Sequence, residues 1–236
     1  MDGITEPVIL VLGHPIAGNP AQFALERAFA SLELEWRVLS SDVTPENLRQ
    51  AIAGAEVLGF RGMLLDESLI RSEEADDGTR HDCLSRDPES EAWQSEDALS
   101  AWLEKRITEK FNSFEKEPDS LLWIGPADPR FPAALRARES QSGIAWASPE
   151  LISNADLIAV TEAVDMTDWP RAEEPTLVVD FATGGNHVDA IRELGYTVID
   201  QLEMTVGRLL RCVECWTGQT VAADVLTEAI EEYLAV

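Results

Sequence analysis

The sequence predicts an α/β fold built from two parallel-sheet units that follow one another along the chain. Short apolar runs ending in glycine, such as residues 8–12 before Gly13, are typical of strands buried on both faces. Segments with apolar residues at helical spacing alternate with these runs. This alternation implies parallel strands with helices packed against the sheet. A chain of 236 residues is long enough for two such units.

The N-terminal part contains three expected strands and two expected helices. In chain order, they are a strand at 8–12, a helix at 25–32, a strand at 36–39, a helix at 45–58 and a strand at 60–65. Thr44 is suited to N-cap the second helix and Gly59 to end it. Residues 66–97 hold 12 acidic residues against three basic ones, so we expect most of this segment to be a solvated, mobile loop.

The C-terminal part repeats the strand–helix alternation after an amphipathic helix at 99–114. The expected strands are 121–124, 144–146, 157–160, 177–179 and 197–199, and the closing helices are 202–216 and 225–234. This pattern predicts an N-terminal α/β domain over 1–115 and a second α/β domain over 119–200. The last two helices, within 200–236, are expected to pack near or against the first domain.

Charge and composition exclude several classes of function. Lys and Arg number 18 against 44 Asp and Glu, a formal net charge of −26, which disfavours binding to nucleic acid and to anionic membranes. No apolar run approaches the roughly 20 residues of a membrane span. The first residues do not resemble a signal peptide, and three cysteines do not suit a disulfide framework, so we expect a cytoplasmic protein.

Three stretches resemble the shikimate dehydrogenase family, two-domain α/β enzymes that reduce 3-dehydroshikimate with NADPH. Residues 13–20 (GHPIAGNP) are similar to the family's G-x-P-I-x-x-S-x-S-P, and residues 59–65 (GFRGMLL) to the start of its G-x-x-G-x-N-V-T-x-P-x-K. Residues 195–204 (GYTVIDQLEM) and 216–218 (WTG) are similar to its G-x-x-v-i-D-G-l-x-M and W-T-G. The resemblance implies a substrate-type parallel-sheet domain followed by a reduced Rossmann-like domain.

The family's substrate-binding and catalytic residues are mostly replaced in this chain. Its two substrate-binding serines fall nearest to Asn19 and Ala21. Its catalytic lysine falls at Ile70, which can carry neither a proton nor a charge. Its partner aspartate, in N-T-D, is best matched by Asp97. The resemblance therefore implies Asn19 and Asp97 as substrate-side residues and leaves Asp97 as the candidate for a catalytic role.

Two further substrate-side candidates are Asp66 and Arg208. Asp66 follows the strand at 60–65, at the edge where open α/β sheets bind ligands, although a plain surface carboxylate is the alternative. Arg208 falls where the family has a glutamine and could grip a carboxylate bidentately. Its alternative is a solvated helix residue, like Arg211 nearby. Asp97 has an alternative too, because acids are favoured in the first turn of a helix.

The cofactor loop is also changed. The family has G-x-G-G-A/S after a strand, where the glycines let backbone N–H groups reach the pyrophosphate. The corresponding residues 124–129 read IGPADP, so one glycine remains, two prolines lack an N–H, and Asp128 adds an anion. The family's arginine for the 2′-phosphate has no counterpart. Gly125 and Gln201, the latter at a family glycine, are the cofactor-side positions that the resemblance implies.

These differences predict that the chain keeps the fold but has lost dehydrogenase activity and NADP binding. The loss of a positioned general acid or base costs roughly 10²–10⁴ in rate. We expect a small carboxylate metabolite or a protein partner to be bound instead. Two alternatives remain open: an active NADP-dependent oxidoreductase on shikimate or 3-dehydroshikimate-like substrates, and an interaction module whose acidic segment 66–97 docks on a basic partner.

A metal site has little support in the sequence. Cys212 and Cys215 form a C-x-x-C pair, but it lies inside an apolar-faced helix and has no second pair. The histidines His14, His81 and His187 are far apart in sequence. We expect the two helical cysteines to be buried or half-buried thiols.

Overall fold

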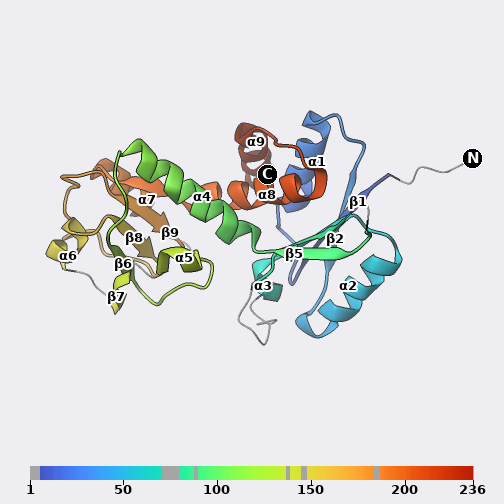
Figure 1. Ribbon diagram of the computed structural model, residues 1–236, viewed down its shortest axis with the longest axis horizontal. Coiled ribbons are helices and arrows are strands. Elements are labelled where there is room, and N and C mark those ends of the chain that lie inside the picture. Colours follow the sequence, from blue (N-terminus) through green and yellow to red (C-terminus); the bar gives the residue numbers. More distant parts are fainter. Residues whose placement is uncertain are drawn as a thin grey trace, which may run out of the picture. The chain divides into compact units, whose positions relative to one another are not determined.

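The computed structural model describes residues 6–70, 80–87, 90–136, 139–144, 148–182 and 187–235 (Figure 1). The chain forms two compact units: unit 1 combines Met1–Leu99 with Val206–Val236, and unit 2 is Ser100–Thr205. Two long helices, α4 (Ala98–Ser113) and α8 (Gln201–Thr217), carry the chain across the two boundaries. Within the described residues, each unit has its own five-stranded sheet.

Unit 1 is built on a mixed sheet with the strand order β2-β1-β3-β4-β5. Its strands are β1 (Val8–Gly13), β2 (Arg37–Asp42), β3 (Gly62–Leu65), β4 (Cys83–Arg86) and β5 (Trp93–Glu96). Strands β2 and β3 pair in parallel with the two sides of β1, whereas β4 and β5 pair antiparallel. All four residues of β3 are buried, and β1 is buried from Ile9 onward, as the continuous apolar runs predict.

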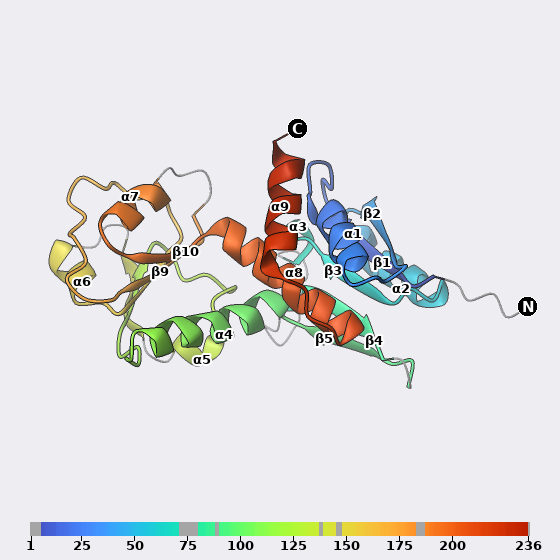
Figure 2. The same cartoon turned by 90° about the horizontal axis from the view of Figure 1, so that it is seen from above.

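Helices from both ends of the chain complete unit 1. They are α1 (Ala21–Ser31), the 3-10 turn η1 (Pro45–Asn47), α2 (Leu48–Val57), α3 (Glu67–Ile70) and α9 (Ala223–Leu234). Helix α9 lies beside α1 (Figure 2), with the rings of Phe23 and Tyr233 6.2 Å apart and Arg27 paired with Glu232 at 2.8 Å. Of the helices that the structure describes, none combines the length and apolar character needed to cross a membrane.

The acidic segment is more ordered than its composition predicts. Its described residues include α3 and the antiparallel β4–β5 hairpin, in which Cys83 faces Glu96. The expectation of a mobile loop is therefore wrong for these residues, while 71–79 and 88–89 lie outside the described part. The hairpin is hidden in the sequence because its strands are short and polar. They form by the pairing of β4 with β3 and of β5 with β4 rather than by burying an apolar run.

A second difference concerns the start of the helix after Thr44. The chain first makes the η1 turn, in which Pro45 occupies the first position, and Thr44 makes no side-chain capping bond there. The α-helix proper begins only at Leu48. Gly59, with φ of 74°, follows the helix end as expected.

Unit 2 has a fully parallel sheet in the order β10-β9-β8-β6-β7. Its strands are β6 (Leu121–Ile124), β7 (Glu139–Ile144), β8 (Leu157–Val160), β9 (Leu177–Asp180) and β10 (Thr197–Ile199). Three short helices not predicted from the sequence are α5 (Ala133–Arg136), α6 (Pro149–Ser153) and α7 (His187–Glu193). The strand expected at 144–146 lies earlier, as β7, and 145–147 are outside the described residues.

Asp156 joins the start of β8 to the turn before β6. Its Oδ2 accepts hydrogen bonds from Asp119 N at 2.9 Å, Ser120 N at 3.1 Å and Ser120 Oγ at 3.0 Å. Its Oδ1 lies 2.5 Å from Lys116 Nζ. Burial alone would raise the pKa of Asp156, but the Lys116 ammonium and these hydrogen bonds lower it below the ordinary 3.8.

We expect Asp156→Asn to destabilise unit 2 by about 1.5–3 kcal/mol at neutral pH, because hydrogen bonds to a charged group are lost or weakened. A lowered folded-state pKa means that the stabilisation is present above the unfolded pKa and disappears as the pH falls through the folded pKa. The difference between wild type and variant should therefore shrink below pH 3.8. Urea unfolding followed by tryptophan fluorescence at neutral and acidic pH measures it, and an equal difference at both pH values would contradict this account.

Candidate functional site

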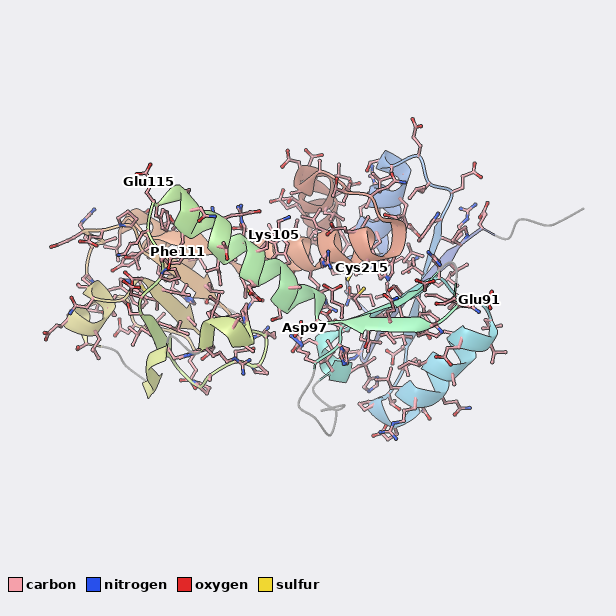
Figure 3. The ribbon with its side chains drawn as sticks, viewed as in Figure 1. Glu91, Asp97, Lys105, Phe111, Glu115 and Cys215 are labelled. Atoms are coloured by element: carbon pink, nitrogen blue, oxygen red, sulfur yellow. The ribbon has the colours of Figure 1, made fainter. Side chains whose placement is uncertain are left out.

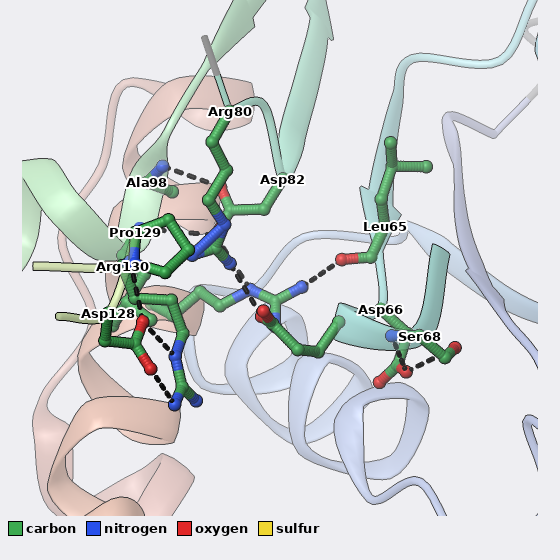
Figure 4. A network of polar contacts seen from close by, with 12 residues as sticks. Leu65, Asp66, Ser68, Arg80, Asp82, Ala98, Asp128, Pro129 and Arg130 are labelled. Atoms are coloured by element: carbon green, nitrogen blue, oxygen red, sulfur yellow. Dashed lines mark hydrogen bonds and ion pairs between the residues drawn. The ribbon is translucent and has the colours of Figure 1, made fainter. Parts of the chain in front are cut away.

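One edge of the unit 1 sheet collects polar side chains from several strands (Figure 4). The parallel strands β1, β2 and β3 end at this edge, and β4 begins there, since Leu65 N donates to Asp82 O at 2.9 Å. Asp82 N donates in turn to Glu96 O at 3.1 Å, which places the end of β5 at the same edge. Open α/β sheets bind ligands where their parallel strands end, so this edge is the candidate site in unit 1.

Asn19 and Asp66, two residues singled out in the sequence, are in direct contact at this edge. Asn19 Nδ2 donates to Asp66 Oδ2 at 2.9 Å, and Asn19 Oδ1 accepts from Ala21 N at 2.9 Å at the start of α1. Asp66 Oδ1 accepts from the Ser68 amide at 3.0 Å and from the Ser68 hydroxyl at 2.8 Å. The Asn19–Asp66 pair therefore ties the loop after β1 to the end of β3, and both side chains already have protein partners.

Asp82 is the carboxylate that starts helix α4. It is fully buried, and its two oxygens accept from Ala98 N at 2.6 Å and from Leu99 N at 3.3 Å. These are amides of the first turn, which have no partner within the helix. Asp97, the acid singled out in the sequence, directly precedes this helix at the end of β5 (Figure 3). The acid that accepts hydrogen bonds from these two helix amides is therefore Asp82, which lies 15 residues before Asp97 in the chain.

Arg208 of α8 reaches the same edge. Its Nη2 donates to the carbonyl oxygen of Leu65, at the end of β3, and its Nε lies 3.1 Å from Asp82 Oδ2 without the alignment of a hydrogen bond. Burial opposes the charged form of Arg208, but Asp82 and other nearby groups raise its pKa above its ordinary value. The Arg208 guanidinium, which the sequence predicts to bind a ligand carboxylate, therefore also connects α8 to the end of β3.

Arg80 is the cation of this edge that sequence analysis did not single out. Its Nη2 lies 2.8 Å from Glu67 Oε2 and 3.8 Å from Asp82 Oδ2. The side chain is only 8% exposed, and its Nε and Nη1 are buried without a hydrogen-bond partner in the described part of the chain. The sequence gives no local signal for its burial, because Arg80 lies in a run of charged residues two positions before Asp82.

Ile70, the residue that the sequence resemblance aligns with the family's catalytic lysine, has an aliphatic environment. It ends α3 and is 7% exposed, and it packs in a cluster with Leu65 and Leu69. Neither its chemistry nor its surroundings suit proton transfer. The carboxylates and guanidinia of this edge can bind and orient a polar ligand, but the described residues of unit 1 place no ammonium group at Ile70's position.

The loop after β6 in unit 2 is filled by its own side chains. Arg130 binds Asp128 through contacts of 2.9 and 2.6 Å, and the Arg130 amide also donates to Asp128 at 2.8 Å. Arg136 donates to the carbonyl oxygens of Asp128, Pro129 and Phe131. Gly125 has φ of 100°, and a Cβ there would lie 2.3 Å from Thr161 Oγ1, so the glycine is required by this close approach.

This loop lacks the arrangement that holds a pyrophosphate. Helix α5, which follows it, spans only Ala133–Arg136, so few aligned amides point at the loop. Elsewhere at this sheet edge, Asp180 accepts from Ala182 N at 3.0 Å and lies 3.2 Å from His187 Nε2. Gln201 donates from Nε2 to Ala182 O at 3.4 Å. Residues 183–186 lie outside the described part of the chain.

A metal centre finds no support in the described residues. Among them, no group of three or more histidine, cysteine, aspartate or glutamate side chains is arranged to hold a metal ion. Cys212 is buried and Cys215 is half-buried, as expected from the apolar helix that carries them.

Comparison with known proteins shows the fold. No protein-family model and no curated protein sequence matches the chain. Among solved structures, quinate dehydrogenase from Corynebacterium glutamicum in complex with NAD matches with a TM-score of 0.75 at 12% identity, covering 96% of this chain and 99% of that chain. Shikimate 5-dehydrogenase from Thermus thermophilus in complex with shikimate matches at 0.66 and 16%, covering 98% and 100%.

A third similar structure is that of an enzyme named for a different activity. The ligand-free 5-ketofructose reductase of Gluconobacter sp. strain CHM43 matches with a TM-score of 0.69 at 16% identity, covering 98% of this chain and 99% of that chain. These similarities confirm the shikimate-dehydrogenase-like α/β fold that the sequence motifs imply. At such low identities they establish the architecture and leave the activity to the residues of the site.

Proposed function

We propose that this chain, which has the fold of the shikimate dehydrogenases, binds a small hydroxylated carboxylate in unit 1 without transferring hydride to or from it. The observation that carries the proposal is the buried guanidinium of Arg80, whose Nε and Nη1 lack an acceptor in the described part of the chain. A buried donor without a partner is costly, and the cost is larger for a charged group. A bound ligand supplies the missing acceptors.

The pattern of unpaired atoms indicates the kind of ligand. Arg80 Nη2 faces Glu67 and Asp82, while Nε and Nη1 lie on different edges of the planar guanidinium. A single carboxylate cannot accept hydrogen bonds from both of these nitrogens in a bidentate arrangement. A molecule that carries a carboxylate and a hydroxyl or carbonyl oxygen can serve both. Shikimate, present in one of the similar structures, is a molecule of this class.

Two independent features argue against hydride transfer. The position of the family's lysine is the buried Ile70, so the expected loss in rate is roughly 10²–10⁴ for the missing acid or base alone. In unit 2, the Asp128–Arg130–Arg136 contacts fill the loop after β6, and Asp128 would repel a phosphate. We therefore assign no NADP to this chain.

The acidic segment 66–97 has a different role in this proposal from docking on a basic partner. Three of its described carboxylates are engaged within unit 1: Asp66 with Asn19, Asp82 with the start of α4 and Arg208, and Glu96 with Arg211. Carboxylates held in this way are not offered to a partner surface. They order the edge of the sheet on which Arg80 lies.

The second candidate function is an active NADP-dependent oxidoreductase on shikimate-like substrates. Its support is that similar structures contain NADP(H) with shikimate, or NAD. We expect NADPH titrated up to millimolar concentrations to cause no saturable change in the fluorescence of the seven tryptophans. The Thermus thermophilus enzyme, which binds NADP(H), is the positive control. Saturable binding together with shikimate-dependent reduction of NADP⁺ would establish the second candidate instead.

Shikimate binding is tested separately by calorimetry with the full chain. We expect saturable binding of shikimate and much weaker binding of its methyl ester, because the ester has no carboxylate to pair with Arg80. Equal affinity for acid and ester would contradict a site built on the guanidinium. If the chain binds neither NADPH nor shikimate, both proposed functions are wrong.

A further inference from the structure

All three cysteines of the chain converge in unit 1. Cys83 begins β4, whereas Cys212 and Cys215 lie on α8, more than 120 residues later in the sequence, since 212 − 83 = 129. Cys83 pairs with Glu96 across β4 and β5, the Cys215 thiol donates to the Glu96 carboxylate at 3.0 Å, and Cys212 lies about one helical turn before Cys215 on α8. The ligand site proposed above uses none of these three side chains, so their convergence calls for a separate explanation.

Backbone pairing and hydrogen bonds place Cys83 and Cys215 on the same side of the hairpin. Cys83 is paired with Glu96 across β4 and β5. The Cys215 thiol, seen in Figure 3 on α8, donates to Glu96 Oε2 at 3.0 Å. The neighbouring Trp216 Nε1 donates to Leu84 O at 2.9 Å, which fixes this turn of α8 over β4. The side chains of Cys83 and Glu96 therefore project to the same face of the hairpin, and the Cys215 thiol contacts Glu96 on that face.

The three thiols differ in their access to solvent. Cys83 is 1% exposed and Cys212 is fully buried, whereas Cys215 is half-buried. Hydrogen bonding to the other two thiols, together with burial, raises the pKa of Cys83, and burial raises the pKa of Cys212. An oxidant arriving from solvent therefore reaches Cys215 first.

Charged side chains lie beside the Cys215 thiol. Glu96 accepts the thiol hydrogen, and Arg211 binds the same carboxylate with contacts of 2.7 and 3.1 Å. The Arg211 guanidinium is therefore held beside the Cys215 thiol by the Glu96 carboxylate that both contact. Thiolates are the reactive form of cysteine toward peroxides and disulfides.

We propose that Cys215 and Cys83 form a reversible disulfide in response to hydroperoxides. The Cys215 thiolate attacks the peroxide O–O bond, giving a sulfenic acid and releasing hydroxide, or water once protonated. The Cys83 thiol then attacks the Cys215 sulfur, forming the S–S bond and releasing a second water. Overall, two thiols and one hydrogen peroxide yield one disulfide and two waters, and a dithiol reductant reverses the reaction.

Geometry favours Cys83 over Cys212 as the partner of Cys215. Residues three apart on a helix have Cβ atoms about 5–6 Å apart. A disulfide needs about 3.5–4.5 Å between Cβ atoms, so a bridge within α8 would distort the helix. Cys83 lies on β4, so its distance from Cys215 is not set by the spacing of residues along α8. Cys212, being buried beside both, remains a free thiol.

The proposal is tested by oxidising the full chain with hydrogen peroxide and counting thiols after denaturation. The count should fall from three to one and return to three with dithiothreitol. Trypsin cuts after Arg80, Arg86 and Arg211, so mass spectrometry should find peptide 81–86 linked to peptide 212–236. The Cys212→Ser variant should form the same link as wild type.

The Cys83→Ser variant separates the two chemical steps. Without the resolving thiol, Cys215 should accumulate as a sulfenic acid that dimedone traps, and no 81–86 link should form. Three outcomes would overturn the proposal: unchanged thiols in the oxidised wild type, a bridge confined to peptide 212–236, or a bridge between two chains on a non-reducing gel. Because the wild-type map and Cys212→Ser do not depend on Cys83→Ser folding, the proposal stays testable if that variant unfolds.

Discussion

Replacing Asp82 by alanine is expected to lower the free energy of unfolding by about 3–5 kcal/mol, because it leaves buried cations without a counter-charge. Asp82 is fully buried, lies 3.1 Å from Arg208 Nε and 3.8 Å from Arg80 Nη2, and accepts the amides of Ala98 and Leu99. Urea unfolding followed by circular dichroism measures the loss. Hydrogen-exchange mass spectrometry should place the loss of protection in β4 and the start of α4.

Asp82→Asn is the matched control for the charge. The amide keeps one oxygen that can accept from Ala98 N but removes the negative charge that faces Arg208 and Arg80. We expect its unfolding free energy to lie between those of wild type and Asp82→Ala. If Asp82→Ala unfolds at the wild-type urea concentration, Asp82 does not organise this edge and the description of the site is wrong.

Arg80→Met is expected to weaken shikimate binding by at least about 30-fold, corresponding to about 2 kcal/mol or more for removal of a buried, hydrogen-bonded charge. Methionine fills much of the same space but has no donor for the ligand. Loss of the Arg80–Glu67 ion pair should lower the free energy of unfolding, and removal of the unpaired Nε and Nη1 atoms should offset part of that loss. Calorimetry with shikimate measures the affinity, and urea unfolding measures the stability.

Arg49→Met is the control for Arg80→Met. Arg49 is an exposed arginine on α2, in the same unit, and its replacement makes the same change in net charge. We expect the Arg49→Met variant to bind shikimate as wild type does. Equal weakening of shikimate binding by both substitutions would mean that the effect comes from the change in net charge. Unchanged binding by Arg80→Met would show that Arg80 does not contact the ligand.

The elements with strong local patterns were predictable from the sequence. The buried strand β1 follows a continuous apolar run, and α8 follows the helical spacing of Leu202, Val206, Leu209 and Val213. Burial on both faces of a parallel sheet and on one face of a helix leaves these periodicities in the chain. The short motifs around Gly13 and Gly195 correctly implied the fold.

The acidic segment shows where local pattern fails. The strands β4 and β5 have four residues each and few apolar side chains. Their stability comes from the pairing of β4 with β3, about 20 residues earlier in the chain, and of β5 with β4. Short helices such as α5 and α6 carry too little periodicity to be seen. Tertiary pairing, rather than propensity, decides the structure of such segments.

The site was only partly predictable for the same reason. Asn19 and Asp66 flank recognisable strand ends, and the structure brings them to 2.9 Å from one another. Arg80 and Asp82 look like two more charges in a solvated run, and nothing local marks them as buried. Burial of a charge depends on partners from elsewhere in the fold, here Glu67 and Arg208.

A crystal structure of the chain grown with shikimate tests the central claim most directly. We expect one ligand oxygen within hydrogen-bond distance of Arg80 Nε and another within hydrogen-bond distance of Arg80 Nη1, with the Asp128–Arg130 contact in unit 2 intact. A structure in which protein groups occupy both Arg80 nitrogens while shikimate binds elsewhere, or in which NADP displaces Arg136 from the loop after β6, would contradict the account.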